Sequence, residues 1–186
     1  MGLEDLQDIL NGCMQNNRAA QEMLYKLFYA DMYRLCQRYI SDAQDTLSVV
    51  NDGFLKVFRN IAQYKPELGH FKSWLKTIMI NTSIDHIRSN KKDMRLIYID
   101  QLQEKGDEDF LTQYRWKHEE LMLHLNNLPA VTRTVVNLFA FDGYTHKEIA
   151  EHLEISETTS RWHLAEARKR LRQSLQLSNP KMAKHE

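Results

Sequence analysis

The stretch from Thr145 to Arg172 constrains the fold more than any other part of the chain, because it carries start signals for two consecutive helices. Thr145 and Glu148 have the spacing of a capping box, in which the hydroxyl and the carboxylate each accept a backbone N–H. A short turn later, Ser156 can cap a second helix, with Glu157 near its positive end. Apolar side chains that we expect to be buried recur at helical spacing in both halves: Ile149, Ala150, Leu153, Leu164, Ala167, Leu171 and Leu175. The pattern predicts a helix-turn-helix unit.

The second helix of this unit carries an excess of positive charge. Between Arg161 and Arg172 the sequence holds five basic residues and one acidic residue, Glu166. Cations in the C-terminal half suit DNA phosphates, whereas the N-terminal half of a recognition helix meets base edges in the major groove. The residues that we predict to contact duplex DNA are Ser156, Thr158, Thr159, Arg161, Trp162, Arg168 and Lys169. The alternative is a helical hairpin whose basic face is only solvated.

The rest of the chain also has the pattern of a helical protein. Only six Gly and three Pro interrupt it, and 42% of its residues are hydrophobic, which is enough for packed cores. Apolar residues recur at helical spacing up to about Ser89, with breaks near Ser41–Asp42 and across 65–69. The first of these apolar stripes begins with Met23, Leu24, Leu27 and Phe28. We therefore predict a bundle of about four helices before residue 90.

After this bundle the composition becomes polar and charged, and helical periodicity is lost until about residue 117. A compact domain rarely contains so long a structureless stretch. We predict an all-α protein with two small helical domains, 1–92 and 117–176, joined by a flexible linker at 93–116. The last residues, 177–186, have the composition of a frayed tail.

Charge and motif content exclude several classes of function. The 25 Lys and Arg balance 25 Asp and Glu, so the chain is not a wholly basic nucleic-acid coat protein. The sequence has no Gly-rich phosphate loop, nucleophile elbow or paired-carboxylate motif. The pairs His118/His124 and His146/His152 are spaced six residues apart, which places them on different helix faces. We predict no enzymatic activity, no cofactor and no metal.

The two cysteines, Cys13 and Cys36, lie in apolar helical patterns without metal-type spacing. We expect both to be buried, reduced thiols, because a free cysteine behaves as a small hydrophobic residue. The acidic start of the chain is unlike a signal peptide, and no apolar run reaches the length of about 18 residues that a membrane span needs. A cytoplasmic protein without direct membrane insertion is therefore expected.

Two separate parts of the chain resemble the same protein family. Four segments resemble region 4 of extracytoplasmic-function (ECF, group IV) RNA polymerase sigma factors of the sigma-70 superfamily: Leu128–Phe139, Gly143–Ala150, Ile155–Ser156 and Ala167–Leu171. The other part lies in the first domain, where the likeness is carried by Phe71–Ile78, Asn81, Asp85 and Arg88. These residues resemble the region 2 segment F-x-x-W-L-x-x-I-x-x-N…D…R, and residues 45–58 are similar to the helix before it. Both likenesses occur in the family's order.

The resemblance implies an alternative sigma factor that binds core RNA polymerase and directs promoter recognition, DNA melting and transcription initiation. The helix-turn-helix would read the duplex minus-thirty-five element. The residues that would contact the melted non-template strand at the minus-ten element are Tyr64, His70, Phe71, Lys72, Lys76, Asn81 and Arg88. The residues that would bind the clamp helices of the polymerase's largest subunit are Asp45, Val49, Asn51, Asp52 and Leu55. The flap of the second-largest subunit and an anti-sigma factor are the other implied partners.

The chain departs from the family pattern in both parts. Thr46, Leu47 and Ser48 replace most of the acidic start of the region 2 helix. Trp162 stands where a small or polar residue is usual, and Glu166 stands where a basic residue is frequent. The second departure predicts an unusual upstream promoter element.

Two alternatives remain open at the level of sequence. Phe71 and Trp74 share helical spacing with Ile78, so each belongs either to a core or to a base-stacking surface. The alternative function is a free-standing helix-turn-helix regulator with an N-terminal sensing or dimerisation domain, which would bind a palindromic site without polymerase.

Overall fold

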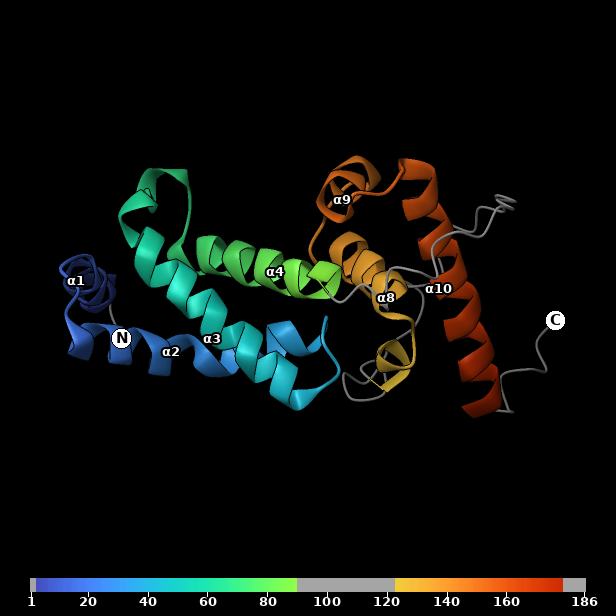
Figure 1. Ribbon diagram of the computed structural model, residues 1–186, viewed down its shortest axis with the longest axis horizontal. Coiled ribbons are helices and arrows are strands. Elements are labelled where there is room, and N and C mark those ends of the chain that lie inside the picture. Colours follow the sequence, from blue (N-terminus) through green and yellow to red (C-terminus); the bar gives the residue numbers. More distant parts are fainter. Residues whose placement is uncertain (1–2, 90–122, 179–186) are drawn as a thin grey trace. The chain divides into compact units, whose positions relative to one another are not determined.

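The computed structural model describes residues 3–89 and 123–178, and all the regular elements within these ranges are helical (Figure 1). The chain divides into two compact units, Met1–His86 and Ile87–Glu186. The predicted linker at 93–116 lies outside the described residues, as does all but the start of the predicted tail, since the last helix continues to Ser178. The all-α prediction is confirmed.

The first unit is built from α1 (Leu3–Met14), α2 (Arg18–Gln37), α3 (Ala43–Asn60) and α4 (Phe71–Ser89). Side-chain oxygens cap two of these helices, since Asn17 accepts the Ala19 and Ala20 amides and Asp42 accepts the Gln44 and Asp45 amides. Between α3 and α4 the chain forms two short 3-10 turns, η1 (Ile61–Gln63) and η2 (Pro66–Leu68). The predicted four helices and both predicted breaks are confirmed.

The core of the first unit is apolar and closely packed. Fully buried side chains from α2, α3 and α4 include Leu24, Met32, Val50, Phe54, Leu75 and Met79. Gly53 permits a close approach of α3 to α4, because a Cβ at this position would lie only 2.4 Å from Met79 Sδ. Cys13 and Cys36 are buried and free, as predicted, and burial raises the pKa of the Cys36 thiol to about 11.

Not every residue of the apolar stripe that begins at Met23 is buried. Met23 and Leu27 are 55% and 38% exposed, whereas Leu24 and Phe28 are buried. Leu24 and Phe28 are four residues apart and share a face of α2. Their neighbours one position earlier are rotated by about 100° around the helix, which turns them toward solvent.

The second unit contains α8 (Ala130–Val136), the π-helical segment η4 (Asn137–Phe141), α9 (His146–Leu153) and α10 (Glu157–Ser178). Pro129 is the N-cap of α8. Thr145 and Glu148 form the predicted capping box, and Glu154 ends α9 in a left-handed conformation with a φ of 55°. Ile149, Ala150, Leu153, Leu164, Ala167 and Leu171 are buried, as predicted; the Leu175 side chain lies outside the described set.

Polar side chains also enter the core of the second unit. His163 of α10 is only 3% exposed, and its Nδ1 lies 2.9 Å from the Thr132 hydroxyl of α8. Burial lowers the pKa of His163 to about 4, so the ring is neutral near neutral pH. His146 of α9 makes a similar contact with Ser160 of α10 at 2.9 Å. These two contacts hold α10 against α8 and α9.

No helix among residues 3–89 and 123–178 is long and apolar enough to cross a membrane.

Candidate functional site

The start of α10 is fixed by a side-chain cap and by the burial of one helix face. Ser156 Oγ accepts the Thr159 amide at 3.0 Å and lies 2.8 Å from the Thr159 hydroxyl, so Ser156 is the cap that the sequence predicted. Leu164, Ala167 and Leu171 are buried, which fixes the rotation of α10 about its axis. The opposite face is therefore available to a partner.

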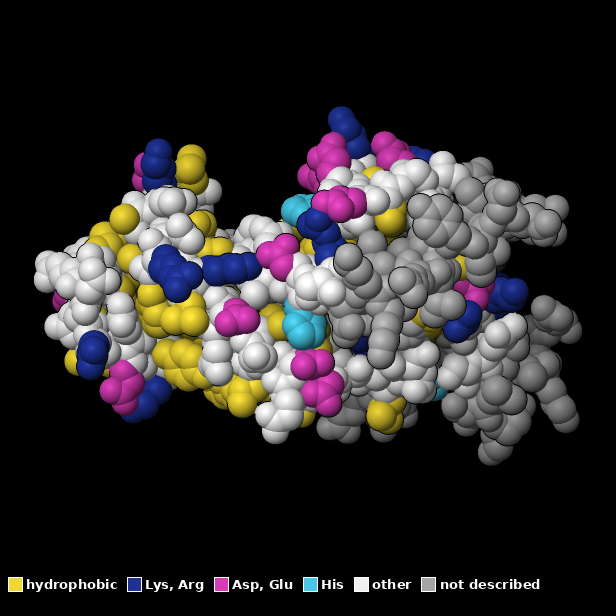
Figure 2. Space-filling model, viewed as in Figure 1, with side chains coloured by type: hydrophobic (Ala, Val, Ile, Leu, Met, Phe, Trp, Pro, Cys, Tyr) yellow, Lys and Arg dark blue, Asp and Glu magenta, His cyan; other side chains and the backbone are white. Residues whose placement is uncertain are grey.

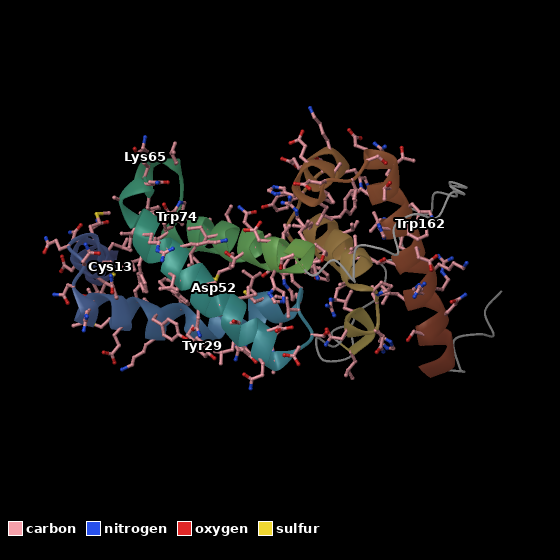
Figure 3. The ribbon with its side chains drawn as sticks, in the orientation of Figure 1. Cys13, Tyr29, Asp52, Lys65, Trp74 and Trp162 are labelled. Atoms are coloured by element: carbon pink, nitrogen blue, oxygen red, sulfur yellow. The ribbon has the colours of Figure 1, made fainter. Side chains whose placement is uncertain are left out.

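The predicted duplex-DNA residues fall on different parts of α10. Thr158, Arg161 and Lys169 are exposed, whereas Thr159, Trp162 and Arg168 are half-buried. The edge of the Trp162 ring meets the ring of His163, with centroids 4.9 Å apart and planes at 73°. Because His163 itself contacts the Thr132 hydroxyl, the Trp162 ring packs against a side chain that is held in place. Trp162 is labelled on α10 in Figure 3.

Two ion pairs within α10 change the electrostatics that the charge count suggested. Arg161 donates to Glu157 at 2.9 Å, and Arg170 donates to Glu166 at 2.6 Å. Both pairs join residues four apart on one helix face. The pairing of Glu157 with Arg161 was not predicted, although the four-residue spacing in the sequence was the available signal. Two of the five basic side chains are thus partly neutralised.

A second candidate surface surrounds the connection between α3 and α4. The Tyr64 hydroxyl donates to the Gly69 carbonyl at 3.1 Å and closes the loop that contains η2. Tyr64 also contacts Phe71 and Trp74, with ring centroids 5.3 and 5.7 Å away. The prediction that Phe71 itself contacts DNA fits its position poorly, because the ring is 2% exposed and packs on Phe28. Trp74 is half-buried in the same cluster (Figure 3).

Basic residues flank this aromatic cluster just before α4 and in its first turns. His70, Lys72 and Lys76 are all exposed. The Lys72 ammonium, however, donates to Asp31 of α2 at 2.5 Å, and this hydrogen bond and charge lower the pKa of the Asp31 carboxyl. The Lys72–Asp31 pair joins residues far apart in sequence, so no local pattern could have predicted it.

Farther along α4, Asn81 has an unusual environment. Its Oδ1 atom is buried and has no hydrogen-bond partner among the described residues. Leaving a buried amide oxygen unpaired costs about 1–3 kcal/mol, so such an atom calls for an explanation such as a bound partner. Arg88, in the last turn of α4, is half-buried.

The third candidate surface is the exposed face of α3 beside α2. Asp52 is exposed and Leu55 is 51% exposed, as the prediction requires. Asp45 lies 3.6 Å from His86 of α4, and Asn51 accepts the Tyr25 hydroxyl at 2.9 Å. The expected exposure of Val49 is wrong: the side chain is 1% exposed and lies in the core, because it shares a helix face with the buried Thr46 and Gly53, three and four residues away.

A row of tyrosines next to this α3 surface was not predicted from the sequence. Tyr25 and Tyr29 have ring centroids 5.2 Å apart, and Tyr29 and Tyr33 have centroids 5.7 Å apart, so the three rings form a continuous half-buried row along α2. Tyr29 and Asp52 are labelled on these neighbouring helices in Figure 3, and Figure 2 shows hydrophobic side chains gathered over the same part of the first unit. The four-residue spacing of the tyrosines was the signal that could have identified the row.

Comparison with known proteins agrees with this arrangement of two helical units. Residues 24–93 match the family described as sigma-70 region 2, and residues 118–171 match sigma-70 region 4. RNA polymerase sigma factor SigV of Bacillus subtilis (strain 168) is 30% identical over 145 residues, which are 76% of this chain and 82% of that protein. ECF sigma factor SigK of Mycolicibacterium vanbaalenii is 25% identical over 177 residues, which are 92% and 89% of the two chains.

A solved structure shares the fold. The sigma factor RpoE of Bartonella quintana, determined in complex with the anti-sigma factor NepR, superposes with a TM-score of 0.51 at 17% identity and covers 85% of this chain and 98% of its own. The chain thus belongs to the sigma-70 family as a member of its ECF group, and is an alternative sigma factor that directs transcription initiation. Its partners as a sigma factor are core RNA polymerase and promoter DNA.

Proposed function

We propose that the second unit reads the duplex minus-thirty-five element by placing α10 in the major groove. The observation that carries this proposal is the second helix of a capped helix-turn-helix, which presents Thr158, Arg161 and Lys169 outward. Thr158, Arg161 and Trp162 would meet base edges, and the contacts to phosphate would come from Ser156, Thr159, Arg168 and Lys169. The N-terminus of α10 adds backbone N–H donors to the phosphate contacts.

The loop between α3 and α4 would bind the melted non-template strand of the minus-ten element. Exposed cations, His70 when protonated, Lys72 and Lys76, suit the backbone of single-stranded DNA, and the half-buried rings of Tyr64 and Trp74 suit unstacked bases. Phe71 would support these rings from the core without touching DNA. Residues farther along α4 complete the proposed surface, with Asn81 near a flipped base and Arg88 near the strand's backbone.

The exposed face of α3 would bind the clamp helices of the polymerase's largest subunit. Asp52 and Leu55 project from this face, with Asn51 and Asp45 beside them. The tyrosine row of α2 extends it with aromatic surface, which is enriched at protein interfaces. The flap of the second-largest subunit would bind the second unit.

The catalytic chemistry belongs to the polymerase, so the chain itself would act without enzymatic activity or a cofactor. It would work where polymerase and chromosome meet, in the bacterial cytoplasm. Since RpoE of Bartonella quintana was determined with an anti-sigma factor, we also propose that an anti-sigma factor covers the polymerase-binding surface of this chain.

The polymerase surface is tested by a matched pair of variants. Leu55→Lys places a charge in the proposed interface, whereas Met14→Lys places the same charge at an apolar position of α1 that is 40% exposed. We expect Leu55→Lys to weaken binding to core polymerase by at least ten-fold, and Met14→Lys to leave it unchanged. Equal effects of the two variants would contradict this interface.

The two DNA surfaces are tested with promoters that carry base changes in one element at a time, because each variant should lose its response to a different element. In transcription assays, Arg161→Ala should make initiation insensitive to base changes in the upstream element while leaving it sensitive to changes in the downstream element. Asn81→Ala should show the reverse. If both variants respond to both elements as the parent chain does, the assignment of these residues is wrong.

A further inference from the structure

The outward face of α10 is organised around an apolar centre. Residues 158, 162, 165 and 169 are spaced four, three and four apart, so Thr158, Trp162, Ala165 and Lys169 form one stripe along the helix. Three of them are exposed and Trp162 is half-buried. The stripe lies opposite the buried side chains of α10, such as Ala167.

The two ion pairs of α10 border this stripe on both sides. At about 100° per residue, Glu157 and Arg161 lie along one edge of the stripe, and Glu166 and Arg170 lie along the other. Their distances of 2.9 and 2.6 Å mean that each cation already has an anionic partner. The middle of the face is therefore left to two uncharged groups, the indole of Trp162 and the methyl of Ala165.

Only one apolar group of unmodified DNA projects into the major groove, and it is the C5-methyl of thymine. The edge-to-face contact of Trp162 with the buried His163 ring limits the freedom of the indole, so it presents a defined apolar surface. Trp162 and Ala165 are separated by about 4.5 Å along the helix axis, which is comparable with the 3.4 Å step between base pairs. Two such groups can meet methyls on adjacent pairs.

We propose that Trp162 and Ala165 read thymine methyl groups at neighbouring positions of the upstream promoter element. The inference rests on the proposed docking of α10 in the major groove and adds the base chemistry that is recognised there. Trp162 determines the preference for thymine at these positions, in addition to the base contacts proposed for Thr158 and Arg161, and Ala165 leaves room for the second methyl. Thr158 and Lys169 bracket the pair and contact the flanking groups.

Uracil interference on the holoenzyme tests this inference, because uracil differs from thymine only by the missing methyl. Core polymerase loaded with the full chain selects promoter fragments from a random duplex pool, and the selected fragments are resynthesised with sparse deoxyuridine. Bound and free fragments are then compared position by position. We expect uracil at one or two adjacent upstream thymines to weaken complex formation about four-fold for each methyl lost.

Variants of Trp162 identify the residue that senses the methyl. Trp162→Ala should abolish the interference at those thymines, and Trp162→Phe should retain most of it because a ring remains. Lys169→Ala is the matched control: it should weaken binding to every sequence and leave the interference pattern intact. On the parent chain, replacing the sensitive T·A pair by C·G should weaken binding, and 5-methylcytosine should restore part of the loss.

The possible results separate the inference from the function on which it rests. If promoter complexes form but uracil in the upstream element has no effect, or if Trp162→Ala keeps the interference, the methyl readout is wrong while the promoter-reading function stands. If the holoenzyme selects no promoter DNA, the proposed docking fails and the inference fails with it.

Discussion

Replacing His163 with glutamine removes a titratable group from the core of the second unit and should change how its stability depends on pH. His163 is 3% exposed, contacts the Thr132 hydroxyl at 2.9 Å, and has a pKa lowered to about 4 by burial. In the unfolded chain the same ring titrates near its ordinary value of 6.5. Between pH 6.5 and 4 the unfolded state therefore binds more protons than the native state, so stability falls as the pH is lowered.

The magnitude follows from these two pKa values. At pH 7.5 the ring is neutral in both states and contributes almost no pH dependence. At pH 4.5 the unfolded chain is protonated and the native ring is mostly neutral, which corresponds to about 2.5 kcal/mol of lost stability. Glutamine keeps an amide near the Thr132 hydroxyl but does not titrate. His163→Gln should therefore lose about 2.5 kcal/mol less than the parent chain when the pH is lowered from 7.5 to 4.5.

Urea unfolding followed by tryptophan fluorescence measures this difference. In a background that carries both Trp74→Phe and Trp116→Phe, the remaining tryptophan is Trp162 of α10, so the signal reports on the second unit. Carboxylates that titrate over the same range affect both proteins equally and cancel in the comparison. Identical pH dependence of the two proteins, or an NMR titration that places the His163 pKa above 6, would refute the reasoning.

Two further predictions concern the first unit. Gly53→Ala should lower the free energy of unfolding by about 1 kcal/mol, because overpacking against Met79 Sδ outweighs the gain in helix propensity. Ser48→Ala, at an exposed position of α3, controls for helix propensity alone. A Gly53→Ala variant that is more stable than its parent in thermal melts would contradict the packing argument. Asp31→Asn should release Lys72 for DNA, so the holoenzyme should bind non-template single strands more tightly. The slope of log K against log salt concentration should steepen by at most about 0.7. The same change in a Lys72→Ala background should have no effect on binding, and an equal effect in both backgrounds would show that Asp31 acts elsewhere.

The helices were predictable because their signals are local. The capping box at Thr145 and Glu148, the cap at Ser156 and the apolar spacing of α10 are all contained within a few turns of chain. The same holds for the Arg161–Glu157 pair, which was not predicted although its spacing was visible.

Contacts between helices were not predictable in the same way. The pairing of Lys72 with Asp31 depends on how α4 packs on α2, and the burial of Val49 depends on which face of α3 meets the core. Periodicity identifies an apolar stripe but fixes its edges poorly, which explains why Met23 and Leu27 belong to the predicted stripe and are nevertheless exposed. The family resemblance supplied the function, whereas the geometry showed which of the proposed DNA residues are exposed and which are buried.

Transcription in vitro from a genomic template pool tests the central claim most directly. With core polymerase and this chain together, we expect discrete start sites preceded by two dissimilar sequence elements at a fixed spacing, and none of these transcripts with either component alone. The absence of promoter-directed transcripts on every template would contradict the account. So would tight binding of a palindromic site by the chain without polymerase, since that is the behaviour of a free-standing helix-turn-helix regulator.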